Sequence, residues 1–162
     1  HTKGAVVQAE LGSVPYLGEM NLGKVEWEKY MTDPEQAKEF VEKTQVDSLA
    51  VAIGNAHGFF QEKKEIDFAR LAKIKQLCDI PLVLHGASDW QNGQITKAIE
   101  NGITCFNIDT AVRLSFMNNL AHAIGEKGEM EMDARKLLTQ AREAVKDMVK
   151  EKIRNFGSEG KA

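Results

Sequence analysis

The sequence contains little cysteine, no long hydrophobic run and no excess of positive charge. Its two cysteines, Cys78 and Cys105, form neither a CxxC motif nor a disulfide framework, which favours a reducing, cytoplasmic location. Each is expected to be a small buried side chain. No run approaches the roughly 18 apolar residues of a membrane span, so we expect no membrane segment. A net charge of −3 provides no basic face, so we expect no nucleic-acid partner.

What is present is the composition of an ordinary globular protein, with 43% hydrophobic and 28% charged residues over 162 positions. This length is enough for one domain with a core. Because no low-complexity segment or linker divides the chain, we predict a single domain over residues 1–162. The chain starts at His1 and reaches an apolar run within a few residues, which we interpret as the later part of a longer protein.

Four apolar runs of strand length recur along the chain. They are rich in β-branched residues and nearly continuous rather than alternating, which is typical of strands that are buried on both faces of a parallel sheet. The runs are Ala5–Leu11, Ser48–Ile53, Pro81–His85 and Thr104–Ile108.

Helical patterns lie between these runs. Thr32-Asp33-Pro34-Glu35 offers an N-cap and a proline for the first turn, Asp67 opens a second helix, and a third ends at Asn101-Gly102. The order β-α-β-α-β-α-β requires parallel strands with right-handed crossovers, so the carboxyl ends of the strands share one edge, where a site is expected. We predict two further helices, over about 111–124 and over 133–157, the second with a charged face in solvent.

Four parallel strands fit either an open sheet or half of an eight-stranded barrel, and the pattern alone does not distinguish them. We favour the barrel, because the abrupt start of the chain suits a missing first half. The predicted fold is therefore α/β: the last four β/α units of a TIM (β/α)8 barrel plus C-terminal helices, with the N-terminal half absent.

Two histidines, His57 and His85, each follow an apolar run and precede a glycine. A single histidine at a strand end is more often a hydrogen-bonded polar group than a metal ligand, but two at equivalent strand ends bring the two interpretations level. Glu10, near the end of the first run, adds a carboxylate to the same edge. Two imidazoles and a carboxylate suit Zn²⁺, although a catalytic site commonly has three firm protein ligands.

The segments after the third and fourth runs carry groups that hold phosphate. His85-Gly86-Ala87-Ser88 supplies backbone amides and a hydroxyl, and Asn107-Ile108-Asp109-Thr110 supplies an amide, a carboxylate and a helix N-terminus. The alternative is that the serine and threonine only cap helices. Asp109 is suited to accept a hydrogen bond from a sugar hydroxyl, which points to a small phosphorylated sugar. Arg113 would pair with a phosphate or with a surface carboxylate.

Taken in order along the chain, these motifs resemble class II, zinc-dependent fructose-bisphosphate aldolases over nearly the whole sequence. The resemblance is carried by Ala9-Glu10-Leu11-Gly12, Asp47 through Gly58, Pro81 through Ser88, Asn107-Ile108-Asp109-Thr110 and Ile153 through Ala162. It implies a ketose-bisphosphate aldolase, an aldehyde-lyase of glycolysis and gluconeogenesis, of which this chain is the C-terminal half.

The resemblance also implies roles for individual residues. His57 and His85 match two of the three zinc-binding histidines, and Glu10 matches a glutamate of an alternative metal position. Arg113 matches an arginine that reaches a substrate phosphate in the neighbouring subunit, which implies a homodimer or higher homo-oligomer. The residues that match groups around the substrate and around a monovalent cation, Na⁺ or K⁺, are Gly58, Gly86, Ser88, Asn107, Asp109 and Thr110.

The implied reaction is the reversible aldol cleavage of fructose 1,6-bisphosphate to dihydroxyacetone phosphate and glyceraldehyde 3-phosphate, with zinc as a Lewis acid on the ketone. The third zinc histidine and a catalytic aspartate would lie on an earlier strand, so the chain alone is expected to be inactive. The acid loop of the family is altered here, and Glu19 is the nearest candidate for the catalytic acid. Cys105 stands where the family has a lysine.

Two alternatives stay open. A tagatose-bisphosphate aldolase is disfavoured by Asp109, because that branch often carries alanine at this position. A non-catalytic half-barrel, which binds a sugar phosphate or serves in dimerisation, is suggested by the missing histidine and the altered loop.

Overall fold

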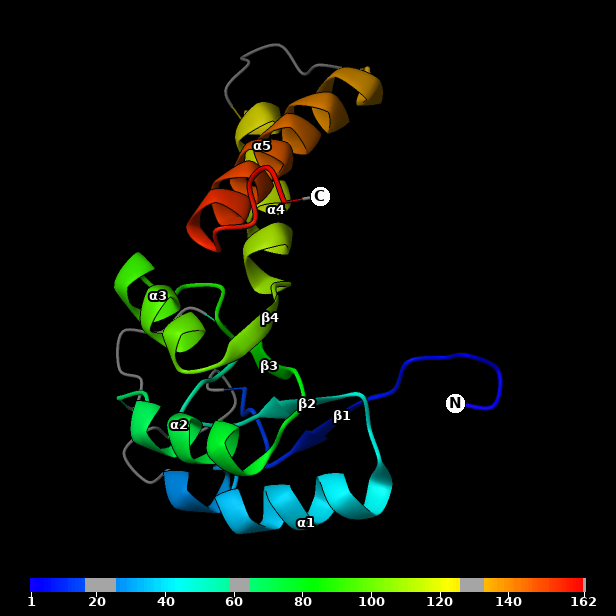
Figure 1. Ribbon diagram of the computed structural model, residues 1–162. Helices are drawn as coiled ribbons and strands as arrows, with labels where there is room; N and C mark the ends of the chain where they lie inside the picture. Colours follow the sequence, from blue (N-terminus) through cyan, green and yellow to red (C-terminus); the bar gives the residue numbers. More distant parts are fainter. Residues whose placement is uncertain (17–25, 59–64, 126–132, 162) are drawn as a thin grey trace. The chain divides into compact units, whose positions relative to one another are not determined.

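The computed structural model describes residues 1–16, 26–58, 65–125 and 133–161 (Figure 1). By their contacts the residues form two compact units, His1–Ile108 and Asp109–Ala162, where the sequence predicts one domain. The first unit holds a parallel sheet with its helices, and the second holds a pair of helices. Among the described residues, no helix is both long and apolar enough to cross a membrane.

The sheet of the first unit is parallel and has the strand order β1-β2-β3-β4. Each strand therefore pairs with the strand that precedes it in the chain. This is the order of a barrel wall, whereas a doubly wound sheet reverses its order at a switch point. The strands, each within or overlapping a predicted run, are β1 (Gln8–Leu11), β2 (Ser48–Val51), β3 (Leu82–His85) and β4 (Ile103–Asn107).

Three helices connect the strands, and their caps explain where they begin. The Asp33 carboxylate accepts a hydrogen bond from the Gln36 amide at 2.9 Å, and α1 (Pro34–Thr44) follows with proline in its first turn. Asp67 caps α2 (Phe68–Leu77) in the same way. The third helix, α3 (Asn92–Glu100), ends at Asn101 as predicted. A short 3₁₀ helix, η3, covers Trp27–Lys29.

The core of the first unit lies along the two central strands. Their fully buried side chains and those of the covering helices include Leu49, Val51, Leu82, Leu84, Leu71, Ile74 and Ile95. The outer strands β1 and β4 are more exposed, since each is an edge of the sheet. Cys78 is buried as expected, but the expectation for Cys105 is wrong, because this residue lies on the edge strand β4 and is exposed.

We expect Cys105 to be the reactive thiol of the native chain. Burial raises the pKa of the Cys78 thiol, so this residue is both shielded and poor in the reactive thiolate. Titration with Ellman's reagent should show one fast thiol in buffer and two in denaturant. Cys105→Ser should remove the fast phase and Cys78→Ser should keep it. Two fast thiols in the native chain would contradict this expectation.

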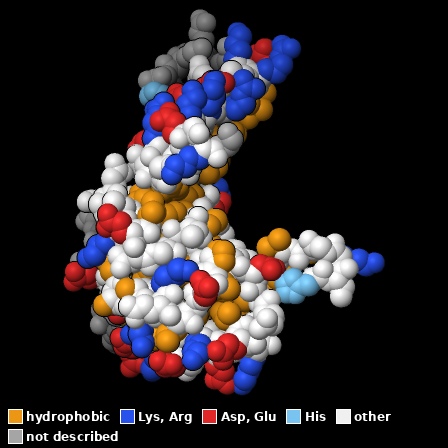
Figure 2. Space-filling view, viewed as in Figure 1, with side chains coloured by type: hydrophobic (Ala, Val, Ile, Leu, Met, Phe, Trp, Pro, Cys, Tyr) orange, Lys and Arg blue, Asp and Glu red, His pale blue; other side chains and the backbone are white. Residues whose placement is uncertain are grey.

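The second unit consists of α4 (Thr110–Gly125) packed against α5 (Ala134–Asn155). Asp133 caps α5, accepting a hydrogen bond from the Arg135 amide at 3.0 Å, so the helix begins close to the predicted position. Figure 2 shows Lys and Arg side chains along the surface of α5, in agreement with the charged face that the sequence predicts. Ala141 is buried, whereas several apolar side chains of the pair are exposed: Leu114, Met117, Ile124, Leu138, Val149 and Ile153.

Candidate metal and sugar-phosphate site

The strands of the first unit bring three of the predicted site residues together, with Glu10 and Asn107 on either side of His85. His85 is the last residue of β3 and is in register with Asn107 on β4. Oε2 of Glu10, from β1, lies 2.8 Å from Nδ1 of His85. On the other side of the ring, Nδ2 of Asn107 lies 3.1 Å from Nε2 of His85. Both ring nitrogens are therefore in contact with a polar neighbour.

The direction of these hydrogen bonds determines which nitrogen can bind a metal ion. A carboxylate only accepts hydrogen bonds, so Nδ1 carries the proton in this pair and Nε2 presents its lone pair to the Asn107 amide. The Cys105 thiol donates in turn to Oδ1 of Asn107 at 3.5 Å, which agrees with this orientation of the amide. A carboxylate on one nitrogen is the arrangement that orients zinc-binding histidines, which then bind through the other nitrogen.

His57 has a different set of neighbours. Its backbone amide donates to the carbonyl of Pro15 at 2.9 Å, and its ring stacks on that of Tyr16 with centroids 4.5 Å apart. Within the described ranges, no three His, Cys, Asp or Glu side chains are grouped so that they could hold a metal ion. The types of donor therefore suit zinc, but His57, His85 and Glu10 do not by themselves form a complete site, and their assignment as ligands stays a prediction.

The glycines next to the two histidines have backbone conformations that favour glycine over other residues. Gly58 and Gly86 have φ of 97° and 69°, in the left-handed region. A Cβ on Gly86 would lie 2.5 Å from the carbonyl oxygen of Ala56, so the segment after β2 passes directly over this residue. Ser88, two residues further, is buried. Gly86 thus has a packing role whether or not it also lies against a phosphate, which stays a prediction.

Three predicted substrate contacts belong to the second unit, at and just before the start of α4. Nη2 of Arg113 lies 2.8 Å from Oδ2 of Asp109, and both side chains are well exposed. Of the two partners that the sequence allows for Arg113, the structure shows the carboxylate. An exposed ion pair of this kind is weak, so it presents little barrier to exchange for a phosphate. Thr110 is the first residue of α4. The predicted catalytic acid, Glu19, lies outside the described residues.

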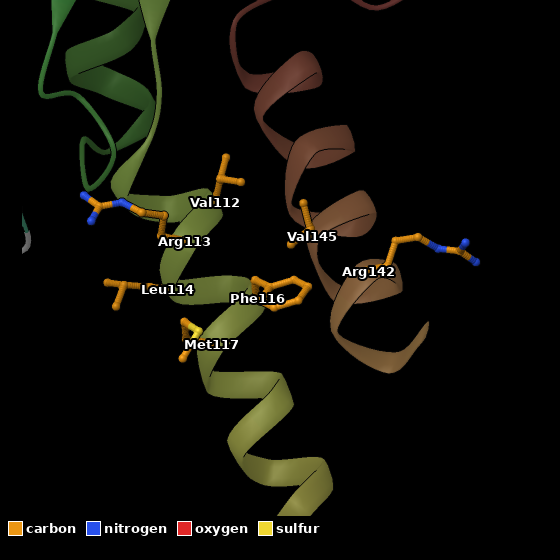
Figure 3. A pocket seen from close by; sticks show the side chains of 7 residues that line it. All are labelled: Val112, Arg113, Leu114, Phe116, Met117, Arg142 and Val145. Carbon is orange, nitrogen blue, oxygen red and sulfur yellow. The ribbon is translucent and has the colours of Figure 1, made fainter. Parts of the chain in front are cut away.

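An apolar cavity of about 550 Å³ lies in the second unit, and Arg113 is among the residues that line it. Figure 3 shows Phe116 of α4 and Val145 of α5 pointing toward one another, with Met117 on the other side of α4. Both arginines that line the cavity are paired with carboxylates. Nη2 of Arg142 lies 3.2 Å from Oε1 of Glu143, and Arg113 pairs with Asp109. The cavity offers mainly apolar surface.

Sequence reasoning missed two residues of the candidate site. Asn55 is 1% exposed, and its Nδ2 donates to the backbone carbonyl of His85 at 2.9 Å. Tyr16 forms an isolated parallel bridge with His57 in addition to the ring stacking. Asn55 could have been identified from the sequence, because it is a polar amide just after a fully apolar run. No local feature of the sequence identifies Tyr16.

We expect Glu10→Gln to weaken zinc binding by about 10–100-fold, the range typical of losing an outer-shell partner of a ligand. The carboxylate fixes the protonated nitrogen of His85, and a neutral amide does so less firmly. Competition against a fluorescent zinc chelator measures the change, with Glu100→Gln at the end of α3 as the control. An unchanged affinity would contradict the orienting role, and a far larger loss would place Glu10 among the ligands.

Comparisons with known proteins bear on the fold and on the family of the chain. The family model of class-II fructose-bisphosphate aldolase matches residues 1–161. The chain is similar to the YdjI aldolase from Escherichia coli K12, with 38% identity and a TM-score of 0.77 over 100% of this chain and 52% of that one. A candidate fructose-1,6-biphosphate aldolase from Coccidioides immitis is 26% identical, with a TM-score of 0.77 over 99% of this chain and 55% of its own.

A third solved structure shows the shared fold alone. The fructose-bisphosphate aldolase from Campylobacter jejuni is 21% identical, with a TM-score of 0.70 over 95% of this chain and 52% of that one. The chain thus spans about half the length of the solved proteins that it matches. These matches confirm the predicted α/β fold class, half of a barrel, and the resemblance that the sequence motifs carry.

Proposed function

The chain belongs to the class II fructose-bisphosphate aldolase family, and we propose that it forms the half of an aldolase barrel that holds two zinc ligands and the substrate phosphates. The observation that carries the proposal is His85, held at a strand end between Glu10 and Asn107 with Nε2 as its lone-pair nitrogen. The residues proposed to hold zinc are His57 and His85, completed by a third ligand from the other half.

Zinc at this position would act as a Lewis acid on the substrate ketone. Glu10 would keep the proton of His85 on Nδ1, and the Asn107 amide would turn from Nε2 toward a substrate oxygen once that nitrogen is engaged. The backbone amides of Gly58 and Gly86 and the hydroxyl of Ser88 would hold a phosphate. The backbone carbonyls of the same residues would bind Na⁺ or K⁺. The contribution of this chain's own residues would therefore be to bind and orient the substrate.

The proposed substrate is fructose 1,6-bisphosphate, cleaved reversibly to dihydroxyacetone phosphate and glyceraldehyde 3-phosphate in the cytoplasm. Asp109 would accept a hydrogen bond from a sugar hydroxyl. Its identity favours this ketose over tagatose 1,6-bisphosphate, because the tagatose branch of the family often carries alanine at the matching position. Arg113 would exchange Asp109 for a phosphate, and the exposed apolar side chains of α4 and α5 support a homodimer or higher homo-oligomer. Glu19 is the proposed catalytic acid.

A non-catalytic half-barrel that binds a sugar phosphate is the second candidate. It is favoured by one observation: the described part of the chain assembles no group of three metal donors. Such a protein would bind fructose 1,6-bisphosphate without cleaving it.

A fusion to the missing half of a barrel tests the proposed activity. We expect the isolated chain to show no cleavage of fructose 1,6-bisphosphate with added zinc, and a folded fusion to the N-terminal half of the YdjI aldolase to release dihydroxyacetone phosphate in a coupled assay. The same fusion with His85→Ala is the control. Turnover by the isolated chain, or none by a folded, zinc-loaded fusion, would contradict the proposal, and faster cleavage of tagatose 1,6-bisphosphate would reassign the substrate.

A further inference from the structure

We propose that Asn55 is a positioning residue of the metal site, whose side chain clamps the ends of β2 and β3 and thereby holds His85 in place. The inference rests on the proposed function, because it gives His85 the role of a zinc ligand. It assigns to Asn55 no contact with metal or substrate.

The Asn55 amide uses both its acceptor and its donors on backbone groups. Oδ1 accepts from the Ile53 amide at 2.7 Å, while Nδ2 donates to the His85 carbonyl at 2.9 Å and approaches the Val51 carbonyl at 3.4 Å. The residue is 1% exposed, so these bonds are shielded from water. A buried amide is costly unless it is satisfied in this way, which makes the arrangement rigid.

This clamp replaces sheet pairing at the point where the pairing stops. The register between β2 and β3 covers only Leu49 with Leu82 and Ala50 with Val83. The pairing of β3 with β4, by contrast, continues to His85 and Asn107. On the β2 side, the His85 backbone is therefore joined to the preceding strand by the Asn55 side chain rather than by the ladder.

The same residue also fixes the segment that leads to the second histidine. Asn55 stands two positions before His57, and the next carbonyl, that of Ala56, lies close over Gly86. One side chain thus ties together the backbones from which both proposed ligands project. Moving either backbone by a fraction of an ångström changes the distance between two donors that must reach one ion.

The test uses the full chain with two substitutions and one control. Asn55→Ala removes the clamp, and Asn55→Asp keeps the shape and the acceptor for Ile53 but replaces the donor to His85. Thr104→Val is the control, because Oγ1 of Thr104 donates to the Leu82 carbonyl at 3.1 Å, at the opposite end of the same strand. Circular dichroism identifies which variants are folded. Two different substitutions of Asn55 are made so that the test can still be carried out if one of them does not fold.

Two readouts separate this inference from the proposed function. ¹⁵N NMR of the imidazoles, without metal, should show His85 losing its fixed Nδ1–H tautomer in the Asn55 variants and keeping it in Thr104→Val. Zinc affinity, from chelator competition, should fall by about 10–100-fold in the Asn55 variants, as for other outer-shell partners, and stay unchanged in the control.

The possible failures are distinguishable. If the His85 signals and the zinc affinity of a folded Asn55 variant equal those of the wild type, the positioning role is overturned while the proposed function stands. If the wild-type chain binds no zinc through His85, the proposed function fails and the inference fails with it, even where the NMR change is seen.

Discussion

Replacing His85 or His57 by alanine is expected to lower the zinc affinity of the chain by more than about 100-fold. This loss exceeds the range that is typical of substituting a residue that only contacts a ligand. Each substitution removes one of the two imidazoles proposed to bind the ion. His85→Ala has a second effect, because it leaves the Glu10 carboxylate and the Asn107 amide without the ring that lies between them. Zinc competition against a fluorescent chelator, followed by metal analysis of the dialysed protein, measures both losses.

His122→Ala is the matched control for these substitutions. His122 lies in the last turn of α4, in the second unit, and no part of the proposed site includes it. Its replacement should leave the zinc affinity as it is. If His57→Ala alone behaves like the control, the stacking of His57 on Tyr16 is its main role. If both variants bind zinc like the wild type, the assignment of the ligands is wrong.

Gly86→Ala should strongly destabilise the first unit. A left-handed backbone costs an L residue about 1–2 kcal/mol, and here the added methyl group would also lie 2.5 Å from the Ala56 carbonyl oxygen. Because that oxygen belongs to the backbone, relief requires a shift of the segment between β2 and His57. We expect the free energy of unfolding to fall by more than the conformational cost alone, measured by urea denaturation followed by circular dichroism.

Gly93→Ala is the control for this substitution, because it should not lower the free energy of unfolding. Gly93 lies in the first turn of α3, and nothing stands within 4 Å of a Cβ built there. Alanine is favoured over glycine in a helix by up to about 1 kcal/mol, so this variant should be as stable as the wild type or more so. Equal stability of Gly86→Ala and Gly93→Ala would show that the loop over Gly86 yields easily, against the rigid arrangement described above.

Features that depend on neighbouring residues in the chain were predictable. The sequence offers Thr32 or Asp33 as the cap of α1, and the structure shows Asp33. It also shows Asp67 at the predicted start of α2, and each carboxylate accepts a hydrogen bond from the backbone amide three residues further along the chain. The end of β3 at His85 is confirmed as well, since glycine interrupts the apolar run there. The beginning of the first strand was not predictable: Val6 is 79% exposed, and pairing starts only where Gln8 meets Ser48.

Features that depend on the spacing of strands could not be obtained from local patterns. The contact of Glu10 with His85 spans from β1 to β3, and the clamp by Asn55 exists only because β2 and β3 part beyond Val83. Exposure of Cys105 follows from the position of β4 at the sheet edge, which an apolar run does not reveal. Polar side chains at strand ends can be expected to meet, but which of them do is decided by strand separation.

X-ray absorption at the zinc edge, measured on the zinc-loaded full chain, tests the proposed metal site most directly. We predict a first shell of nitrogen and oxygen at about 2.0–2.1 Å with the outer-shell scattering of two imidazoles, which falls to one imidazole in His85→Ala. A sulfur at about 2.3 Å would instead place zinc on a cysteine. That result, or a spectrum unchanged by His85→Ala, would contradict the claim that this edge of the sheet supplies two histidine ligands.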